Sequence, residues 1–175
     1  MAKEKKTAIY PGTFDPITKG HLDIIKRAIS IFDEVIVAVA KNPSKKVLFS
    51  YLERLKMVKK IVKKMEKVKV EGLEGLVVDF AKEKKAKVVI RGLRMVSDFE
   101  YEFQMALTNR NLDPQIETIF LIPHPRYSYI SSRLIKEAAF LGADLEEFLP
   151  KYVIKILKKK IREAEIEDRS RKNKG

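Results

Sequence analysis

The chain has 175 residues and no cysteine, and its lysines and arginines give it a formal net charge of +13. This length fits a single domain with a real core, and the missing thiols exclude disulfide scaffolds, thiolate metal sites and cysteine nucleophiles. No apolar leader follows the charged first residues, and no apolar run approaches the roughly 20 residues of a membrane span. We therefore expect a cytoplasmic protein with no membrane partner.

The positive charge raises the alternative of a nucleic-acid partner. Nearly half of the surplus lies in residues 151–175, and much of the rest falls on lysines set among apolar residues in 52–65. That spacing is typical of a solvated helix face. No RNP, GXXG or helix-turn-helix pattern accompanies it. We expect no nucleic-acid partner, and a basic nucleic-acid-binding module stays as a remote alternative.

Short runs rich in Val and Ile alternate with helical patterns along the chain. Strands are predicted at 7–10, 34–40, 68–71, 88–90 and 117–122. Apolar residues three or four apart predict helices over 22–32, 52–65, 76–85, 99–108 and 131–141. This alternation predicts a Rossmann-like, doubly wound α/β fold with a five-stranded parallel sheet in the order 3-2-1-4-5 and C-terminal helices.

The C-terminal part carries one more pattern. Apolar residues among the lysines of 152–161 predict a last amphipathic helix, which we expect to pack on its own domain or on a sister subunit. A membrane surface is the alternative for this helix. We predict one domain over residues 1–167 and a disordered basic tail over 168–175.

Polar segments follow the first, fourth and fifth predicted strands. They cover residues 11–21, 91–94 and 123–133. In the predicted order these three strands are neighbours, and their carboxyl ends open onto the crevice between strands one and four. We therefore expect the three segments to converge on one site.

The first segment has the composition of a phosphate-binding loop. Gly12 permits a tight exit from the strand, and Gly20 lets a ligand approach where a helix begins. His21 lies in that first helical turn, where its ring can donate to a phosphate oxygen. The alternative is a histidine that only caps the helix or packs beside the loop.

The other two segments also carry anion-binding groups. Arg91 and Arg94 can grip phosphate oxygens in pairs, although ion pairing with Asp98 or Glu100 is an alternative. The hydroxyl-rich third segment precedes a helix, so Ser131 or Ser132 can cap it while main-chain N–H groups meet phosphate. No nucleophile-and-base arrangement is present, which favours catalysis by positioning and charge neutralisation.

These motifs carry a family resemblance. Tyr10 to His21 resembles the T/HxGH signature of the nucleotidylyltransferase superfamily and, in its extended form, the phosphopantetheine adenylyltransferase family. Arg91-Gly92-Leu93-Arg94 with residues 98–102 is similar to that family's second signature. Residues 127–133, with Ile130-Ser131-Ser132, are similar to its third. The likeness runs from about residue 7 to residue 157.

The resemblance implies a reaction. ATP would give its adenylyl group to 4'-phosphopantetheine by direct in-line displacement, forming dephospho-coenzyme A and pyrophosphate. Mg²⁺ would sit on the ATP phosphates without side-chain ligands, and the assembly would be a homohexamer built of two trimers. A sister enzyme with another phosphate acceptor, such as nicotinamide mononucleotide, is the main alternative, since the glycine-histidine loop serves the whole superfamily.

The resemblance also assigns residues. His21, Lys45 and Arg94 would be catalytic. The pantetheine substrate would be bound by Thr13, Lys45, Val77 and Arg91. Arg133 stands where many members carry a serine, so only a main-chain role carries over there. ATP would be surrounded by Thr13, Phe14, His21, Gly92, Leu93, Arg94, Glu102, Tyr127, Ser128, Tyr129, Ile130, Ser131, Ser132 and Arg133.

Overall fold

Five parallel strands form the central sheet of the protein, seen in a computed structural model that describes residues 5–41 and 46–172, with side chains to residue 166. The strand order is β3-β2-β1-β4-β5, which confirms the predicted sheet. Every strand pair is parallel, with Thr7 opposite Glu34 at the start of the β1 and β2 register. The strands are β1 (Thr7–Gly12), β2 (Glu34–Ala40), β3 (Val68–Leu73), β4 (Val88–Gly92) and β5 (Glu117–Leu121).

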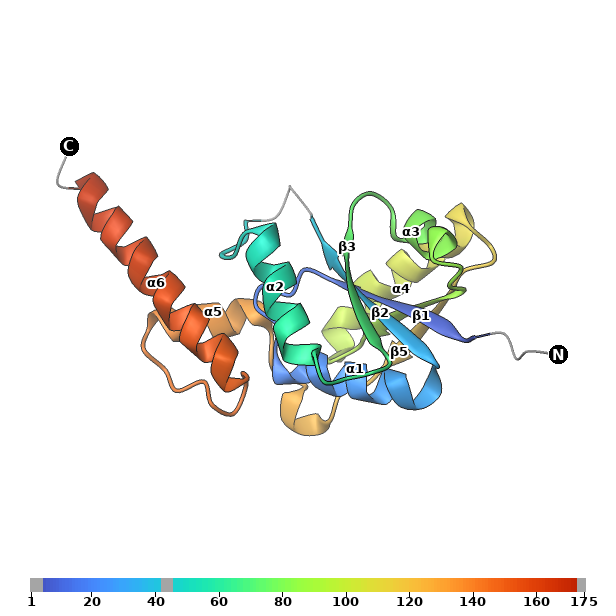
Figure 1. The fold of residues 1–175 in the computed structure, drawn as a ribbon, viewed down its shortest axis with the longest axis horizontal. Helices are drawn as coiled ribbons and strands as arrows, with labels where there is room; N and C mark the ends of the chain where they lie inside the picture. The colour runs from blue at the N-terminus through green and yellow to red at the C-terminus, as the bar shows by residue number, and fades with distance from the viewer. Residues whose placement is uncertain (1–4, 42–45, 173–175) are drawn as a thin grey trace.

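Helices cover both faces of the sheet (Figure 1). One core cluster joins the strands to α1, α2, α5 and α6, and a second joins them to α3. α4 packs beside β5 and α3. The helices are α1 (Lys19–Ile31), α2 (Tyr51–Val62), α3 (Val77–Glu83), α4 (Val96–Leu112), α5 (Ser132–Phe140) and α6 (Lys151–Lys172), with a short 3₁₀ helix, η1 (Pro125–Tyr127).

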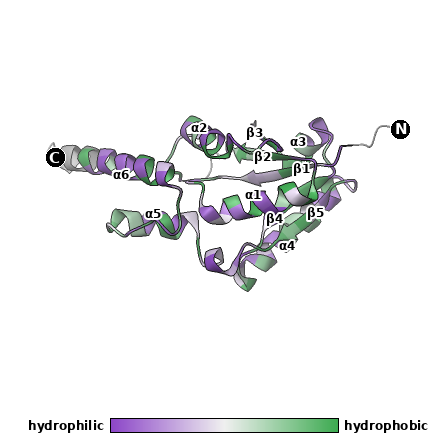
Figure 2. Ribbon diagram, turned by 60° about the horizontal axis from the view of Figure 1, so that its bottom comes forward, coloured by the Kyte–Doolittle hydropathy of each residue, from purple (hydrophilic) through white to green (hydrophobic). Residues whose placement is uncertain are grey.

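Residues of β1 and β2 alternate between the two cores. Ala8 and Tyr10 face the first cluster, whereas Ile9 faces the second. In β2, Val35 and Val37 likewise oppose Ile36. Since helices bury both faces, these strands read as continuous apolar runs rather than alternating ones. In Figure 2, hydrophobic residues occur along strands such as β2 and β5, and the helices around the sheet carry both hydrophilic and hydrophobic residues.

Two helices differ most from the sequence prediction. α4 spans Val96–Leu112 rather than 99–108, because its apolar residues occur all around it and mark no single face. α6 continues to Lys172, past residue 168, where we placed the start of a disordered tail. No Gly or Pro interrupts Ile161 to Lys172, and Lys, Arg and Glu are good helix formers. Residues 173–175 lie outside the described part.

α6 extends away from the sheet beside α5 and α2 (Figure 1). Val153, Leu157 and Ile161 on its first three turns are buried in the first core cluster, so the predicted packing of this helix on its own domain is confirmed. Within the residues that the structure describes, no helix is both long and apolar enough to span a bilayer.

Candidate active site

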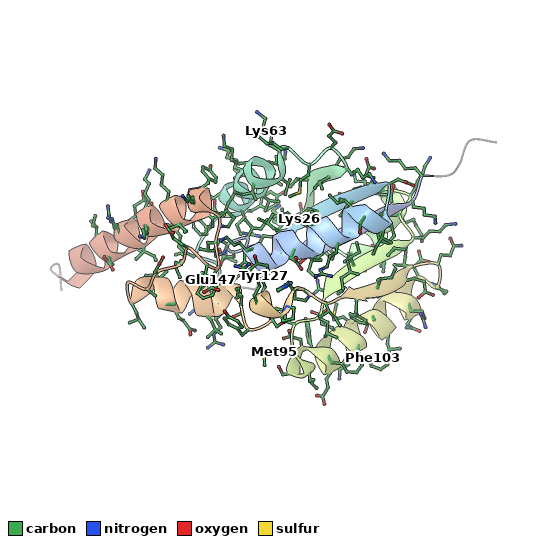
Figure 3. All side chains as sticks on the ribbon, turned by 90° about the horizontal axis from the view of Figure 1, so that it is seen from below. Lys26, Lys63, Met95, Phe103, Tyr127 and Glu147 are labelled. Carbon is green, nitrogen blue, oxygen red and sulfur yellow. The ribbon has the colours of Figure 1, made fainter. Side chains whose placement is uncertain are left out.

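A cavity of about 370 Å³ opens at the carboxyl ends of β1 and β4. The three polar segments meet there, as the strand order predicted: Gly20 and His21, Arg94, and Ser131 all line it. Tyr127 lies against the start of α1 (Figure 3), 3.4 Å from the point where a Cβ on Gly20 would stand. The predicted site residues on the cavity wall are Thr13, Phe14, His21, Arg91, Gly92, Arg94, Glu102, Tyr127, Ile130, Ser131, Ser132 and Arg133.

Of the remaining predicted site residues, those that the structure describes are not among the residues that line the cavity. The Leu93 N–H bonds to the carbonyl of Leu121 and so prolongs the β4–β5 ladder. Ser128 closes η1 through its N–H, and Tyr129 packs edge-on against Phe148. Val77 opens α3 and packs on the second core cluster. Lys45 lies outside the described residues, and its neighbour Lys46 lines the cavity.

His21 is held by the cap of α1. Thr18 is the N-cap residue, and its side chain accepts a hydrogen bond from the His21 N–H over 3.2 Å. In return, the main-chain N–H of Thr18 donates to His21 Nδ1 over 3.0 Å. A ring nitrogen that accepts cannot carry the proton of a neutral imidazole, so the proton sits on Nε2. The capping alternative is therefore present, and it orients His21 as a donor on the cavity wall.

The surroundings of His21 keep its ring neutral. Burial, followed by the nearby charges of Arg94 and Arg91, lowers the pKa of His21 to about 4. The Phe14 ring packs edge-on against it, with centroids 5.1 Å apart. Nε2–H therefore stays available as a neutral donor through the physiological pH range.

We expect an NMR titration to place the His21 pKa near 4. The chain has two histidines, so a His124→Ala variant assigns the signals. In the unfolded chain the pKa of this histidine is about 6.5, so between about pH 6.5 and pH 4 the unfolded state binds a proton that the folded state does not. The His21 contribution to the free energy of unfolding is therefore present above about pH 6.5 and is lost as the pH falls towards 4. A His21 midpoint near 6.5 would contradict the buried, neutral ring.

The turn after β1 is strained. Phe14 has a φ of 51°, in the left-handed region that an aromatic residue seldom adopts. Its ring covers Gly12 so closely that a Cβ there would lie 2.8 Å from the ring. The same ring touches His21 and, with centroids 5.6 Å apart, Tyr10. Glycine at position 12 thus lets Phe14 fold back towards His21.

Arg91 is fixed by a two-pronged ion pair. Its Nε and Nη2 donate to the two carboxylate oxygens of Glu102 over 2.6 and 2.7 Å. Its Nη1 donates to the carbonyl of Pro11 over 3.1 Å. Glu102 is largely buried, so this pair couples α4 to the ends of β4 and β1.

Arg94 links the second and third segments. It donates to both carboxylate oxygens of Asp98 over 3.1 and 3.2 Å, and to the carbonyl of Ile130 over 2.8 Å. The Asp98 ion pair considered from the sequence is therefore present. This ion pair leaves the Arg94 guanidinium on the cavity wall, where a phosphate can compete with Asp98 for the N–H groups of Arg94.

The serines of the third segment shape the start of α5. Ser131 is the N-cap, and its hydroxyl accepts from the N–H of Leu134 over 3.1 Å. The Ser132 hydroxyl donates to the carbonyl of Pro16 over 2.8 Å. Arg133 is exposed and pairs with Glu137 one turn on. These contacts tie the third segment to the first.

Sequence reasoning missed several residues of the cavity region. Tyr10, Asp15 and Lys136 line the cavity, and Lys136 forms an ion pair with the buried Asp15. Arg54 lies behind the cavity wall, fully buried, and bonds to main-chain carbonyls. In the sequence, Asp15 stands within the first polar segment and Lys136 follows the third, but Arg54 resembles the lysines of a solvated helix.

The cavity has the electrostatics of a polyanion site. The cavity wall carries five cationic side chains and three carboxylates. The cations are Lys46, Arg91, Arg94, Arg133 and Lys136, and the carboxylates are those of Asp15, Asp98 and Glu102. Positive charge therefore predominates beside the neutral donor of His21 and the helix start at Gly20, an arrangement suited to phosphate groups.

Comparison with known proteins places this fold and cavity in a class. Residues 9–138 match the cytidylyltransferase-like family. A protein from Vibrio parahaemolyticus, assigned as a nicotinate-nucleotide adenylyltransferase, shares the fold with a TM-score of 0.66 and 19% identity, over 87% of this chain and 98% of its own. The fold and site thus define a cytidylyltransferase-like protein.

Curated relatives narrow the class. A phosphopantetheine adenylyltransferase from Clostridium botulinum (strain Hall) is 55% identical over 156 residues, which make up 89% of this chain and 95% of that protein. Another, from Clostridium novyi (strain NT), is also 55% identical, over 89% of this chain and 97% of its own. The chain belongs to the phosphopantetheine adenylyltransferase family.

Proposed function

We propose that this chain transfers the adenylyl group of ATP to 4'-phosphopantetheine, giving dephospho-coenzyme A and pyrophosphate. The observation that carries the proposal is the meeting of His21, Arg94 and Ser131 on one cationic cavity at the switch point of the sheet. Relatives that are 55% identical bear the name of this activity.

The cavity supports a single displacement. An oxygen of the acceptor phosphate attacks the α-phosphorus of ATP, and the bond from that phosphorus to the oxygen bridging to the β-phosphate breaks as pyrophosphate leaves. His21 Nε2–H and the Arg94 guanidinium would stabilise the charge on the reacting phosphates, with Thr13 beside them. Such catalysis rests on positioning and on preorganised donors.

The proposal divides the wall between two ligands. Thr13 and Arg91 on the cavity wall, together with Val77 at the start of α3 and with Lys45, would bind the phosphopantetheine. The third segment and the Gly92 to Arg94 turn would enclose ATP. Lys45 would neutralise the reacting phosphates, and its neighbour Lys46 faces the same cavity.

Mg²⁺ is proposed to be coordinated by the ATP phosphates rather than by side chains. Among the side chains that the structure describes, in residues 5–41 and 46–166, no group of three or more His, Asp or Glu is placed to hold a metal. The acidic side chains of the wall are each engaged by a cation: Asp15 by Lys136, Asp98 by Arg94 and Glu102 by Arg91. Phosphate oxygens are the ligands that Mg²⁺ takes in most nucleotide sites.

An acceptor comparison tests the proposal. Purified protein with ATP and Mg²⁺ should release pyrophosphate and form dephospho-coenzyme A when 4'-phosphopantetheine is added, and should do neither with nicotinamide mononucleotide. Release with nicotinamide mononucleotide alone would move the chain to a sister activity. Tight, salt-sensitive oligonucleotide binding without any turnover would favour the nucleic-acid alternative.

We further propose a homohexamer in the cytoplasm. α4 buries two polar residues, Glu102 and Asn109, and leaves large apolar side chains in water. Met95 and Phe103 lie along its outer edge (Figure 3). A patch of this kind on a soluble protein is typical of a subunit interface. Its exposed apolar members include Met95, Val96, Phe99, Tyr101, Phe103, Leu107 and Leu112.

For the proposed homohexamer, light scattering should give a mass about six times the 20.2 kDa of the chain. The Phe103→Glu variant should give a lower mass, because an unpaired charge in an apolar interface costs about 2 kcal/mol or more. Leu52→Glu is the matched control, since Leu52 is an exposed apolar residue of α2. A monomeric wild-type protein, or equal masses for the two variants, would contradict the α4 interface.

A further inference from the structure

A buried guanidinium holds three main-chain carbonyls behind the cavity. Arg54 on α2 is 1% exposed. Its Nη1 donates to the carbonyls of Thr13 and Ala40 over 2.6 and 2.8 Å, and its Nε donates to that of Phe49 over 3.2 Å. These carbonyls belong to the turn after β1, the end of β2 and the start of α2. Arg54 thus joins the turn after β1, 41 residues away in the sequence, to the end of β2 and to the residues just before α2.

A full charge in this position is costly. All three acceptors are neutral, and a buried charge without a direct partner is strongly disfavoured unless hydrogen bonds replace its water. Burial lowers the pKa of Arg54, and the nearby charge of Asp15 opposes that shift. Packing alone would be served by an apolar residue. The retained arginine therefore points to a task that depends on its planar fork of donors.

That task lies in the strained turn. The carbonyl of Thr13 belongs to the peptide group that leads into Phe14, whose φ is 51°. Fixing this peptide fixes the direction in which the Phe14 ring leaves the backbone. The ring then packs on His21, with centroids 5.1 Å apart. A continuous path thus runs from Arg54 through the Thr13–Phe14 turn to the imidazole.

Asp15 completes the arrangement from the other side. It is buried and accepts from the N–H groups of Leu48 and Phe49 over 3.0 and 2.9 Å. The cation of Arg54 and the anion of Asp15 therefore both connect the turn after β1 to the segment that leads into α2, which includes the wall residues Lys46 and Val47.

We infer that Arg54 is a positioning residue of the adenylyl transfer: it holds the Thr13–Phe14 turn in the conformation that sets His21 and Thr13 on the cavity wall. The inference rests on the proposed function for its kinetic consequence. The geometric consequence, a change in the surroundings of His21, is independent of any activity.

The test compares Arg54→Lys with Met57→Ala. Lysine keeps the charge but cannot span the three carbonyls. Met57 is buried in the same helix, so its truncation weakens α2 and leaves the Arg54 guanidinium with its hydrogen bonds in place. At a temperature where circular dichroism shows both variants folded, we expect Arg54→Lys to lower kcat by about 10-fold or more with a smaller change in KM, because a misplaced donor costs rate. We expect Met57→Ala to stay near the wild-type kcat.

NMR supplies the second readout. The His21 ring signals should shift in Arg54→Lys and stay in place in Met57→Ala. Phe14→Leu, which leaves Arg54 intact, should shift them as well, and it keeps the path testable if Arg54→Lys does not fold. Equal kcat losses in Arg54→Lys and Met57→Ala, or unmoved His21 signals in Arg54→Lys and Phe14→Leu, would overturn the inference. If the wild type shows no transfer, the proposed function fails, and the His21 signals still decide the role of Arg54.

Discussion

Replacing His21 by alanine is expected to lower kcat by about 10²-fold or more, since the loss of one transition-state donor typically costs about 3 kcal/mol. The neutral Nε2–H is held on the cavity wall by the bond from the Thr18 N–H to Nδ1. KM for ATP should change much less, because the donor acts mainly on charge that develops during the transfer. Steady-state assays of both substrates measure the two effects.

Two controls separate chemistry from folding in this experiment. His21 also closes the capping box of α1, so its removal should lower the free energy of unfolding by about 1 kcal/mol. A urea titration measures that cost, which is too small to unfold the domain. His124→Ala, at the exposed cap of η1, should keep kcat within about twofold of wild type. A folded His21→Ala protein with near-normal kcat would remove the catalytic role.

Removal of Glu102 is expected to be the most destabilising change at the site. Burial tends to lower the pKa of Arg91, but the bonds and charge of Glu102 outweigh it and raise the pKa overall. Glu102→Ala would leave that guanidinium largely buried without its partner, at a cost of about 3 kcal/mol or more in unfolding free energy. Catalysis should fall too, since Arg91 would lose the carboxylate that aims it into the cavity.

Matched variants sharpen this prediction. Glu117 pairs with Arg110 at the surface, with more than half of each side chain exposed, so Glu117→Ala should change stability by less than about 1 kcal/mol. The double variant Arg91→Met with Glu102→Leu should recover most of the lost stability but no activity, because it removes both charges. Equal effects of Glu102→Ala and Glu117→Ala on the urea midpoint would show that burial does not strengthen the pair.

The strand order and the cavity could be predicted because their causes are local in the sequence. Apolar runs between polar turns indicate parallel strands, and the sheet order then brings Gly20, Arg94 and Ser131 to one rim. From the sequence, helix capping by His21 is an alternative to phosphate binding. In the structure the cap positions the ring on the cavity wall, so one does not exclude the other.

The parts that escaped prediction depend on contacts between distant residues. Arg54 lies 41 residues from Thr13, and its partners are main-chain carbonyls that have no signature in side-chain patterns. Asp15 meets the amides of Leu48 and Phe49 in the same way. The sequence underestimates the length of α4 because its apolar residues occur all around the helix and form no stripe towards the core.

The most direct test of the account is the stereochemical course at the α-phosphorus. The cavity is proposed to hold ATP and the acceptor together so that one phosphate displaces the other without a covalent enzyme intermediate. ATP that carries sulfur in place of one α-oxygen, in a defined configuration, should give dephospho-coenzyme A of inverted configuration, as a single in-line displacement requires. Retention of configuration would mean two displacements through an enzyme nucleophile and would contradict the account.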